Sequence, residues 1–221
     1  MNILLIECTR KIVEFAFSKS NEIVILKELD SESNADSLIY TINQEFEKSP
    51  FDFKSVEAVS LSNGPGSFTG LRIGSAIAKG ICFSLGAKLL EISTLDILAN
   101  KYEPLDSKET FMPLIFSNSK TLEFYTAVYR KENGKLLRIS DYEIKKFEEF
   151  SESGSTFILN DKTDFSFPGN FKFVDVSSES NMLSQHALTM EYIIENKFSD
   201  FRTSEPFYMK KFVPLKKGSK S

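Results

Sequence analysis

The feature that most constrains the fold of this chain is the order of strands and helices in roughly its first hundred residues. Residues 3–6 form a short, continuous apolar run, which is typical of a strand buried on both faces. Two runs rich in β-branched and aromatic residues follow at 12–17 and 23–29, separated by a short polar turn. The sequence then predicts helices over 34–48 and 71–86, strands over 56–62 and 89–92, and a third helix from Ser93.

This order predicts a mixed sheet. Short turns require antiparallel pairing of the first three strands, whereas connections that contain a helix imply parallel pairing of the later ones. The resulting βββαβαβα pattern matches the ribonuclease H-like core shared by actin-like ATPases. We therefore expect an α/β fold of that class.

The second half of the chain has a less regular pattern. Strands are predicted over 111–117, 122–130, 135–142, 156–159 and 171–176, with a hairpin turn at Asn133-Gly134. A helix is predicted over 182–197, with Leu183 and Ile194 on its apolar side. The periodicity breaks near Pro104. We therefore divide the chain into an N-terminal lobe, 1–104, and a smaller C-terminal lobe, 105–221.

The composition excludes several classes of protein. The chain has a formal net charge of −4, two cysteines and a single histidine, His186. Two cysteines exclude a disulfide framework and a four-cysteine zinc site, and one histidine excludes metal sites that need two. No apolar run is long enough to span a bilayer, and Glu7 and Arg10 interrupt the apolar start of the chain. We expect a reduced, cytoplasmic protein without a membrane segment or signal peptide.

A glycine-rich loop joins a predicted strand to the second predicted helix, where open α/β sheets usually bind ligands. The P-loop pattern fails because three residues, not four, separate Gly66 from Gly70, and Leu71 stands where lysine is needed. The dinucleotide pattern fails because Thr69 stands at the third glycine position. Backbone amides at this helix start, capped by Ser67 or Thr69, leave anion binding open.

The helix after this loop has one face that is almost bare of side chains. Small residues recur every four positions, at Gly70, Gly74, Ala78, Cys82 and Gly86. Arg72 and Lys79 are the only charges from 71 to 86. A glycine inside a helix costs about 1 kcal/mol relative to alanine, so close approach by another element must offset that cost. The sequence leaves two interpretations, packing within this chain and contact of one face with another protein.

Catalytic machinery is not evident, and we predict no catalytic residue and no metal ligand. A nuclease of this fold needs several carboxylates around two metal ions, and Glu7 is a candidate, but the fourth predicted strand ends without an acid. An actin-like ATPase needs a glycine in its first hairpin, where Cys8 stands. We expect Cys8 to be a small buried residue at a strand end, and His186 to pack or face solvent.

The glycine-rich loop resembles the signature of the TsaB family. The resemblance rests on Gly64, Pro65, Gly66, Ser67, Phe68, Thr69, Gly70, Leu71, Arg72, Ile73 and Gly74. Residues 123–125 resemble the Glu-Val-Tyr of the family, and residues 206–210 its closing Pro-x-Tyr-Leu-Arg. The chain departs from the family at 118–120 and at Glu7, and residues 151–170 lack a Gly-Asp-Gly-like pattern. These departures suggest a degenerate C-terminal lobe.

The resemblance implies a two-lobed actin-like ATPase (ribonuclease H-like) fold and a non-catalytic pseudoenzyme. Such a subunit belongs to the complex that installs threonylcarbamoyl on adenosine 37 of tRNAs that read codons beginning with A. It implies a heterodimer with a TsaD-like transferase paralogue, and a TsaE-like ATPase that joins the complex. ATP and a metal are implied only for these partner subunits, and no cofactor is expected in this chain. The tRNA is reached through the complex.

We assign the partner interface to the first two helices, because the second is nearly free of charge. The residues of this hypothesis are Leu38, Ile42, Gly74, Ala76, Ile77, Lys79, Gly80 and Phe83. An exposed apolar face would also allow a homodimer of the isolated chain. The alternative is an actin-like nucleotide-binding enzyme or a peptidase-like relative. The lysines after Met209 are expected to be solvated, with contact to tRNA as the alternative.

Overall fold

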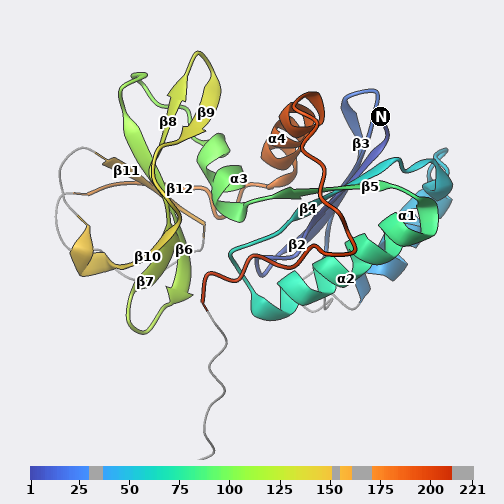
Figure 1. Cartoon of the computed structure of the whole chain (residues 1–221), viewed down its shortest axis with the longest axis horizontal. Coiled ribbons are helices and arrows are strands. Elements are labelled where there is room, and N and C mark those ends of the chain that lie inside the picture. Colours follow the sequence, from blue (N-terminus) through green and yellow to red (C-terminus); the bar gives the residue numbers. More distant parts are fainter. Residues whose placement is uncertain (30–36, 151–154, 161–170, 211–221) are drawn as a thin grey trace, which may run out of the picture.

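The first sheet has the topology that the sequence predicts. The computed structural model describes residues 1–29, 37–150, 155–160 and 171–210 (Figure 1). The strands of the first sheet are β1 (Ile3–Glu7), β2 (Val13–Lys19), β3 (Glu22–Leu29), β4 (Ala58–Ser62) and β5 (Lys88–Ile92). They lie in the order β3-β2-β1-β4-β5, with antiparallel pairing among the first three and parallel pairing of β4 with β1 and β5. The predicted pairing is confirmed.

Helices cover both faces of this sheet. Helices α1 (Leu38–Lys48) and α2 (Phe68–Leu85) pack on one face, and α4 (Met182–Ile194) packs on the other. The side chains of β1 alternate between these layers, because Leu4 lies in the cluster with α1 and α2 while Leu5 lies in the cluster with α4. A strand covered on both sides explains the continuous apolar run at the start of the sequence.

The helix boundaries differ slightly from the prediction. Residues 34–36 of the first predicted helix lie outside the described residues, and the described part of α1 begins at Leu38. Helix α2 begins at Phe68 rather than Leu71, because Ser67 Oγ accepts a hydrogen bond from the Gly70 N–H at 3.2 Å and caps the helix there. Helix α3 (Thr94–Lys101) follows β5 as predicted. Within the described ranges, no helix has the length and apolar character needed to cross a membrane.

The described residues of the second half form a sheet of seven strands. These are β6 (Thr110–Asn118), β7 (Glu123–Thr126), β8 (Tyr129–Glu132), β9 (Lys135–Arg138), β10 (Glu143–Lys146), β11 (Ser155–Leu159) and β12 (Lys172–Asp175). The strand predicted over 122–130 is divided between β7 and β8, and β10 was missed because its residues are mostly charged. The turn at Asn133-Gly134 is confirmed, with the positive φ angles of 52° and 77° that tight hairpins favour.

The apolar face predicted for α4 is wrong. Leu183 and Ile194 are 70% and 82% exposed, whereas Gln185 and Thr189 are fully buried against the first sheet. Gln185 Nε2 donates to the Ser60 carbonyl oxygen at 3.0 Å, and Thr189 Oγ1 lies 2.7 Å from Ser60 Oγ. Because hydrogen bonds to β4 satisfy these polar groups, the helix can bury a face that hydrophobicity alone does not identify.

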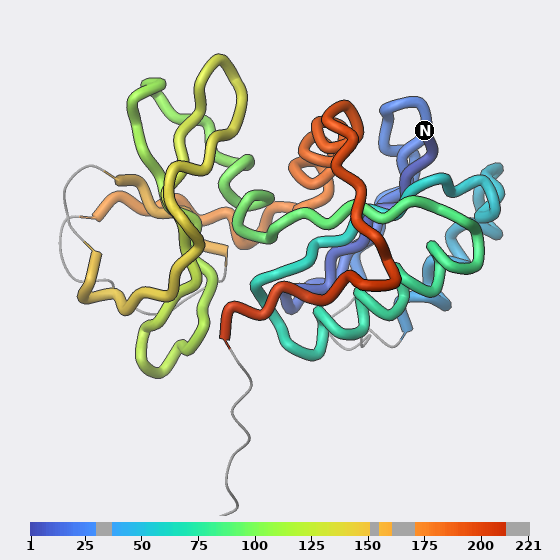
Figure 2. The backbone as a smooth tube through the Cα atoms, viewed as in Figure 1, coloured from blue at the N-terminus to red at the C-terminus, as the bar shows by residue number. Residues whose placement is uncertain are grey.

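After forming the strands of the second sheet, the chain returns to the first sheet with α4 and the residues that follow it. The strands of the first sheet precede residue 104, and those of the second follow it. Helix α4 nevertheless packs on the first sheet, and the Ser199 N–H donates to the Leu89 carbonyl oxygen at 2.9 Å. The described part of the segment 105–221, predicted as one lobe, is therefore shared between the two sheets. Figure 2 shows its last described part, in red, running past α2 toward the second sheet.

Candidate functional site

The glycine-rich loop is held by segments that are distant in the sequence. The Gly64 carbonyl oxygen accepts a hydrogen bond from the N–H of Thr94, the first residue of α3, at 2.8 Å. The carbonyl oxygen of Asn63, just before the loop, accepts one from the Phe207 N–H at 2.9 Å. Gly64 has a φ of +107°, a conformation that L side chains rarely adopt. The loop thus begins where α3 and the C-terminal segment meet β4.

The glycines of this motif allow close packing on the end of β1. A Cβ built on Gly66 would lie 2.6 Å from the Thr9 carbonyl oxygen, and one built on Gly70 would overlap the carbonyl oxygen of Cys8. The Ser67 N–H donates to the Thr9 carbonyl oxygen at 2.8 Å. Packing within this chain therefore accounts for the first part of the bare helix face.

The sequence left anion binding open at this helix start, but three of the backbone N–H groups there already donate hydrogen bonds within the chain. The N–H of Ser67 bonds to Thr9, that of Gly70 to the Ser67 hydroxyl, and that of Leu71 to the Ser67 carbonyl oxygen at 2.8 Å. Of the two capping residues considered, Ser67 is the cap, and Thr69 lies exposed in the first turn of α2. These N–H groups therefore hold the loop and the first turn of α2 in place and are not available to an anion.

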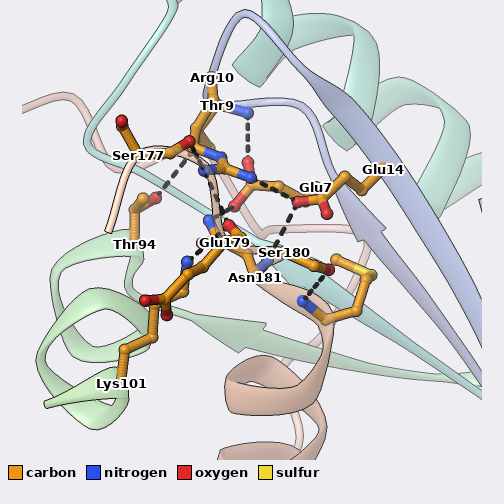
Figure 3. A network of polar contacts seen from close by, with 11 residues as sticks. Glu7, Thr9, Arg10, Glu14, Thr94, Lys101, Ser177, Glu179, Ser180 and Asn181 are labelled. Atoms are coloured by element: carbon orange, nitrogen blue, oxygen red, sulfur yellow. Dashed lines mark hydrogen bonds and ion pairs between the residues drawn. The ribbon is translucent and has the colours of Figure 1, made fainter. Parts of the chain in front are cut away.

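A buried polar cluster lies where the first hairpin meets the segment before α4 (Figure 3). Arg10 Nη2 lies 2.8 Å from Glu14 Oε2, and both side chains are buried. Arg10 Nη1 donates to the carbonyl oxygens of Ser177 and Glu179, at 3.3 and 3.2 Å. The N–H of Asn181 donates to Glu14 Oε2 at 3.1 Å. The cation of Arg10 is thus neutralised by Glu14 and held on the backbone of the chain itself.

Glu7, the candidate nuclease carboxylate, belongs to the same cluster. One of its oxygens accepts the Thr9 N–H, and the other accepts Asn181 Nδ2 at 3.0 Å. Lys101 Nζ donates to the Glu179 carbonyl oxygen at 2.8 Å. Burial, followed by the nearby positive charge of Arg10, lowers the pKa of Lys101 to about 8. The two acids of this cluster, Glu7 and Glu14, and its two cations, Arg10 and Lys101, therefore all make hydrogen bonds to other groups of this chain. The sequence offered no signal for the pairing of Arg10 with Glu14, because the partners face each other only in the folded hairpin.

Cys8 and His186 both make contacts within this chain. Cys8 is buried as predicted, and burial, with the charge of Glu7 as a smaller cause, raises the pKa of its thiol far above the ordinary range. His186 Nε2 lies 2.8 Å from Ser18 Oγ, and burial lowers the pKa of His186. In the described parts of the chain, His, Cys, Asp and Glu side chains form no group of three that could hold a metal ion.

A pocket of about 800 Å³ opens beside the glycine-rich loop. Its walls come from the loop, the first turns of α2, strand β7 and the last described residues of the chain. The lining residues are Pro65, Gly66, Phe68, Leu71, Arg72, Tyr125, Phe207, Tyr208, Met209 and Lys210. Three motifs that are separate in the sequence, the loop and residues 123–125 and 206–210, therefore meet at one place. Lys210 Nζ pairs with Glu123 Oε2 at 2.7 Å and ties two of them together.

Three of the predicted interface residues lie inside this chain. Leu38 and Ile42 are fully buried in the core beneath α1. Gly74 faces β1, where an added Cβ would lie 3.3 Å from the Cβ of Cys8. These three residues face the core beneath the helices, so we leave them out of the surface considered further.

The other five predicted interface residues lie on the outer side or the flank of α2. Ala76 and Gly80 are exposed, and Phe83 is 80% exposed. Ile77 and Lys79 are half-buried, and Lys79 Nζ donates to the carbonyl oxygen of Ser204. The part of α2 that faces away from the sheet thus carries small and apolar side chains. On α1, Ile39 and Tyr40 are also exposed, at 43% and 64%.

Comparisons with known proteins agree with this architecture. The family model described as "TsaD: tRNA N6-adenosine threonylcarbamoyltransferase" matches residues 25–197. A solved structure from Pseudomonas aeruginosa, described as an uncharacterized protein with similarity to peptidase YEAZ, superposes with a TM-score of 0.73 over 95% of this chain and 99% of that chain. Its sequence identity is 14%, so this match shows the fold alone. The predicted two-lobed class of fold is confirmed.

Curated relatives match part of the chain. The tRNA threonylcarbamoyladenosine biosynthesis protein TsaB of Buchnera aphidicola subsp. Acyrthosiphon pisum is 27% identical over 135 residues, which are 61% of this chain and 60% of the relative. The tRNA N6-adenosine threonylcarbamoyltransferase of Clostridium botulinum strain Hall is 25% identical over 163 residues, 71% of this chain and 44% of the relative. The matches span about 60% of the TsaB protein and less than half of the transferase. The chain belongs to the family of the TsaD model, and within that family it is a TsaB-type protein.

Proposed function

We propose that this protein takes part in the biosynthesis of threonylcarbamoyladenosine in tRNA, as a non-catalytic subunit that pairs with a TsaD-type transferase. The names of its relatives support the pathway, since one is a TsaB protein of this biosynthesis and another is the transferase. The proposal assigns ATP, the metal and the transfer to adenosine 37 of tRNAs reading A-starting codons to partner subunits, including a TsaE-type ATPase. It assigns the complex to the cytoplasm.

The observation that carries the pairing proposal is the outer side of α2. Gly80 lies in the interior of this helix, where glycine costs about 1 kcal/mol relative to alanine, and an added Cβ would meet no atom within 4 Å. Packing within the chain therefore gives no reason for glycine at this position. One turn away, Phe83 is 80% exposed. A small residue beside an exposed aromatic ring suits the close approach of a helix from another protein.

The polar cluster supports a non-catalytic role. Glu7, Arg10 and Glu14 are buried, and each makes hydrogen bonds to groups of this chain. A group that acts on a substrate must be within hydrogen-bond reach of it, and these side chains are occupied in joining the first hairpin to the segment before α4. The cluster therefore suits a structural joint better than an active site.

The pairing proposal is tested by co-purification of tagged variants with the TsaD-type protein of the same organism. We expect Phe83→Glu to abolish co-purification, because a carboxylate would be buried without a partner in the contact. Ala76→Arg, about two helical turns earlier on the same side of α2, should have the same effect. Leu183→Glu is the matched control, since Leu183 is 70% exposed on α4, on the opposite face of the sheet.

The variants distinguish a specific interface from a general loss of folding. Circular dichroism of all three variants should match that of the unchanged protein, because the altered side chains are exposed. Co-purification that survives both α2 changes, or that is lost equally in Leu183→Glu, would remove this surface from consideration. Analytical ultracentrifugation of the isolated chain shows in addition whether the same α2 changes dissociate a homodimer.

A further inference from the structure

The pocket beside the glycine-rich loop has walls suited to an aromatic ligand. Phe68 of α2 and Tyr208 of the C-terminal segment lie with their ring centroids 5.3 Å apart, and Tyr125 and Phe207 also line the space. The volume of about 800 Å³ lies within the range of roughly 300–1,000 Å³ that is usual for small-molecule sites. Aromatic walls favour planar ligands, because rings stack on one another with little loss of side-chain freedom.

The charges at the pocket favour an anion. The guanidinium carbon of Arg72 lies 4.7 Å from the centroid of the Phe68 ring, which leaves the edge of the guanidinium available for hydrogen bonds. In the described residues, Arg72 forms no ion pair with a carboxylate, whereas Lys210 is neutralised by Glu123 at 2.7 Å. Arg72 therefore brings an uncompensated positive charge, in a geometry that suits a phosphate or carboxylate.

We propose that this pocket binds a small ligand that combines a planar aromatic group with an anionic group and has about the size of a mononucleotide. The aromatic group would lie against Phe68 and Tyr208, and the anionic group would take hydrogen bonds from Arg72. This site lies at the N-terminal end of α2, one helical turn from Ala76 of the pairing surface and far from Phe83 at the other end of that surface. Phe68 and Phe83 are 15 residues apart, which in a helix corresponds to roughly 22 Å.

Binding is tested on the full chain by calorimetry with four probes. Adenosine monophosphate and 1-naphthyl phosphate have both an aromatic and an anionic group, adenosine lacks the anion, and ribose 5-phosphate lacks the aromatic ring. We expect both aromatic phosphates to bind, and adenosine and ribose 5-phosphate to bind at least about tenfold more weakly, because each loses one of the two kinds of contact. Binding of adenosine monophosphate alone would indicate recognition of the base edge as well.

Variants connect the binding to the pocket. Arg72→Gln should weaken both aromatic phosphates by about tenfold or more, since the charge-assisted hydrogen bonds are lost. Arg202→Gln, which changes an arginine whose side chain is 76% exposed and lies outside the pocket, is the matched control and should leave binding unchanged. The methyl resonance of Met209, which lines the pocket, should shift on titration. The proposal is overturned if neither aromatic phosphate binds at millimolar concentration, or if Arg72→Gln binds them as the unchanged protein does.

Discussion

The role of the glycines in α2 can be tested by one methyl group at each of two positions. Gly70→Ala directs a Cβ into the backbone of Cys8, where the carbonyl carbon would lie only 2.9 Å away. Ordinary contacts of a Cβ begin at about 3.4 Å, so the start of α2 would have to move away from β1. Gly80→Ala adds the same methyl group to the same helix, but there the space is open.

The two substitutions should change the free energy of unfolding in opposite directions. At Gly80, alanine should stabilise the protein by roughly 0.5–1 kcal/mol, because it improves helix propensity and reduces the freedom of the unfolded chain. At Gly70 the same gain is opposed by overpacking, which costs about 1–3 kcal/mol in a closely packed site. The stability of Gly70→Ala should therefore lie about 1–3 kcal/mol below that of Gly80→Ala.

Urea denaturation followed by circular dichroism measures this difference, provided that the slopes of the transitions agree. A shift of the midpoint to lower urea for Gly70→Ala and to higher urea for Gly80→Ala would support close packing as the reason for the motif glycines. Equal stabilisation by both changes would falsify that explanation.

The remaining predictions concern the buried polar and titratable groups. Arg10→Met should destabilise the protein by about 3–5 kcal/mol, measured by denaturation, because it leaves Glu14 buried without its cation. Stability should fall as the pH decreases below about 6.5, because the pKa of the partly buried His186 is lower in the folded chain than in the unfolded chain, which therefore takes up the proton first. The part of this fall that His186 contributes should end once the pH passes below the pKa of His186 in the folded chain, and it should be absent in His186→Gln. Cys8 and Cys82 are buried, and burial raises the pKa of the Cys82 thiol to about 11, so thiol reagents should label both only on the timescale of unfolding.

Each of these predictions has its own control. Arg202→Met removes an arginine that is 76% exposed and lies 3.8 Å from Asp200, so its effect should stay within about 0.5 kcal/mol. An equally small effect of Arg10→Met would show that the buried pair contributes little. His186 is the only histidine of the chain, so its ring protons report its pKa directly in a proton NMR titration. A pKa at or above 6.5 would contradict the assigned effect of burial. Rapid labelling of either cysteine in native buffer would contradict its burial.

Local patterns were sufficient for most of the fold. The continuous apolar run of β1, the short turns after it and the two helical segments predicted the order and the pairing of the first sheet, because these depend on periodicity and connection length. The cap at Ser67 and the hairpin turn at Asn133-Gly134 were predictable for the same reason, since neighbouring residues decide them. The start of α2 was placed three residues too late, because the apolar periodicity begins after the capped first turn.

The second half was harder to predict because its elements depend on distant partners. Strand β10 has the sequence Glu-Ile-Lys-Lys and becomes a strand by pairing with β7. Helix α4 buries Gln185 and Thr189 because Ser60 of β4 supplies their hydrogen bonds, so the largest apolar residues of the helix were assigned to the wrong face. Neither partner is identifiable from the segment itself.

The sequence by itself determined the family, the elements of the first sheet and the absence of paired histidines. It could not decide which apolar helix residues face inward, because burial depends on what covers each face. The tertiary structure placed Leu38, Ile42 and Gly74 inside and left Gly80 and Phe83 outside. It also joined the glycine-rich loop to Tyr125 and Tyr208 around one pocket, since only folding brings together residues that are this far apart in the chain.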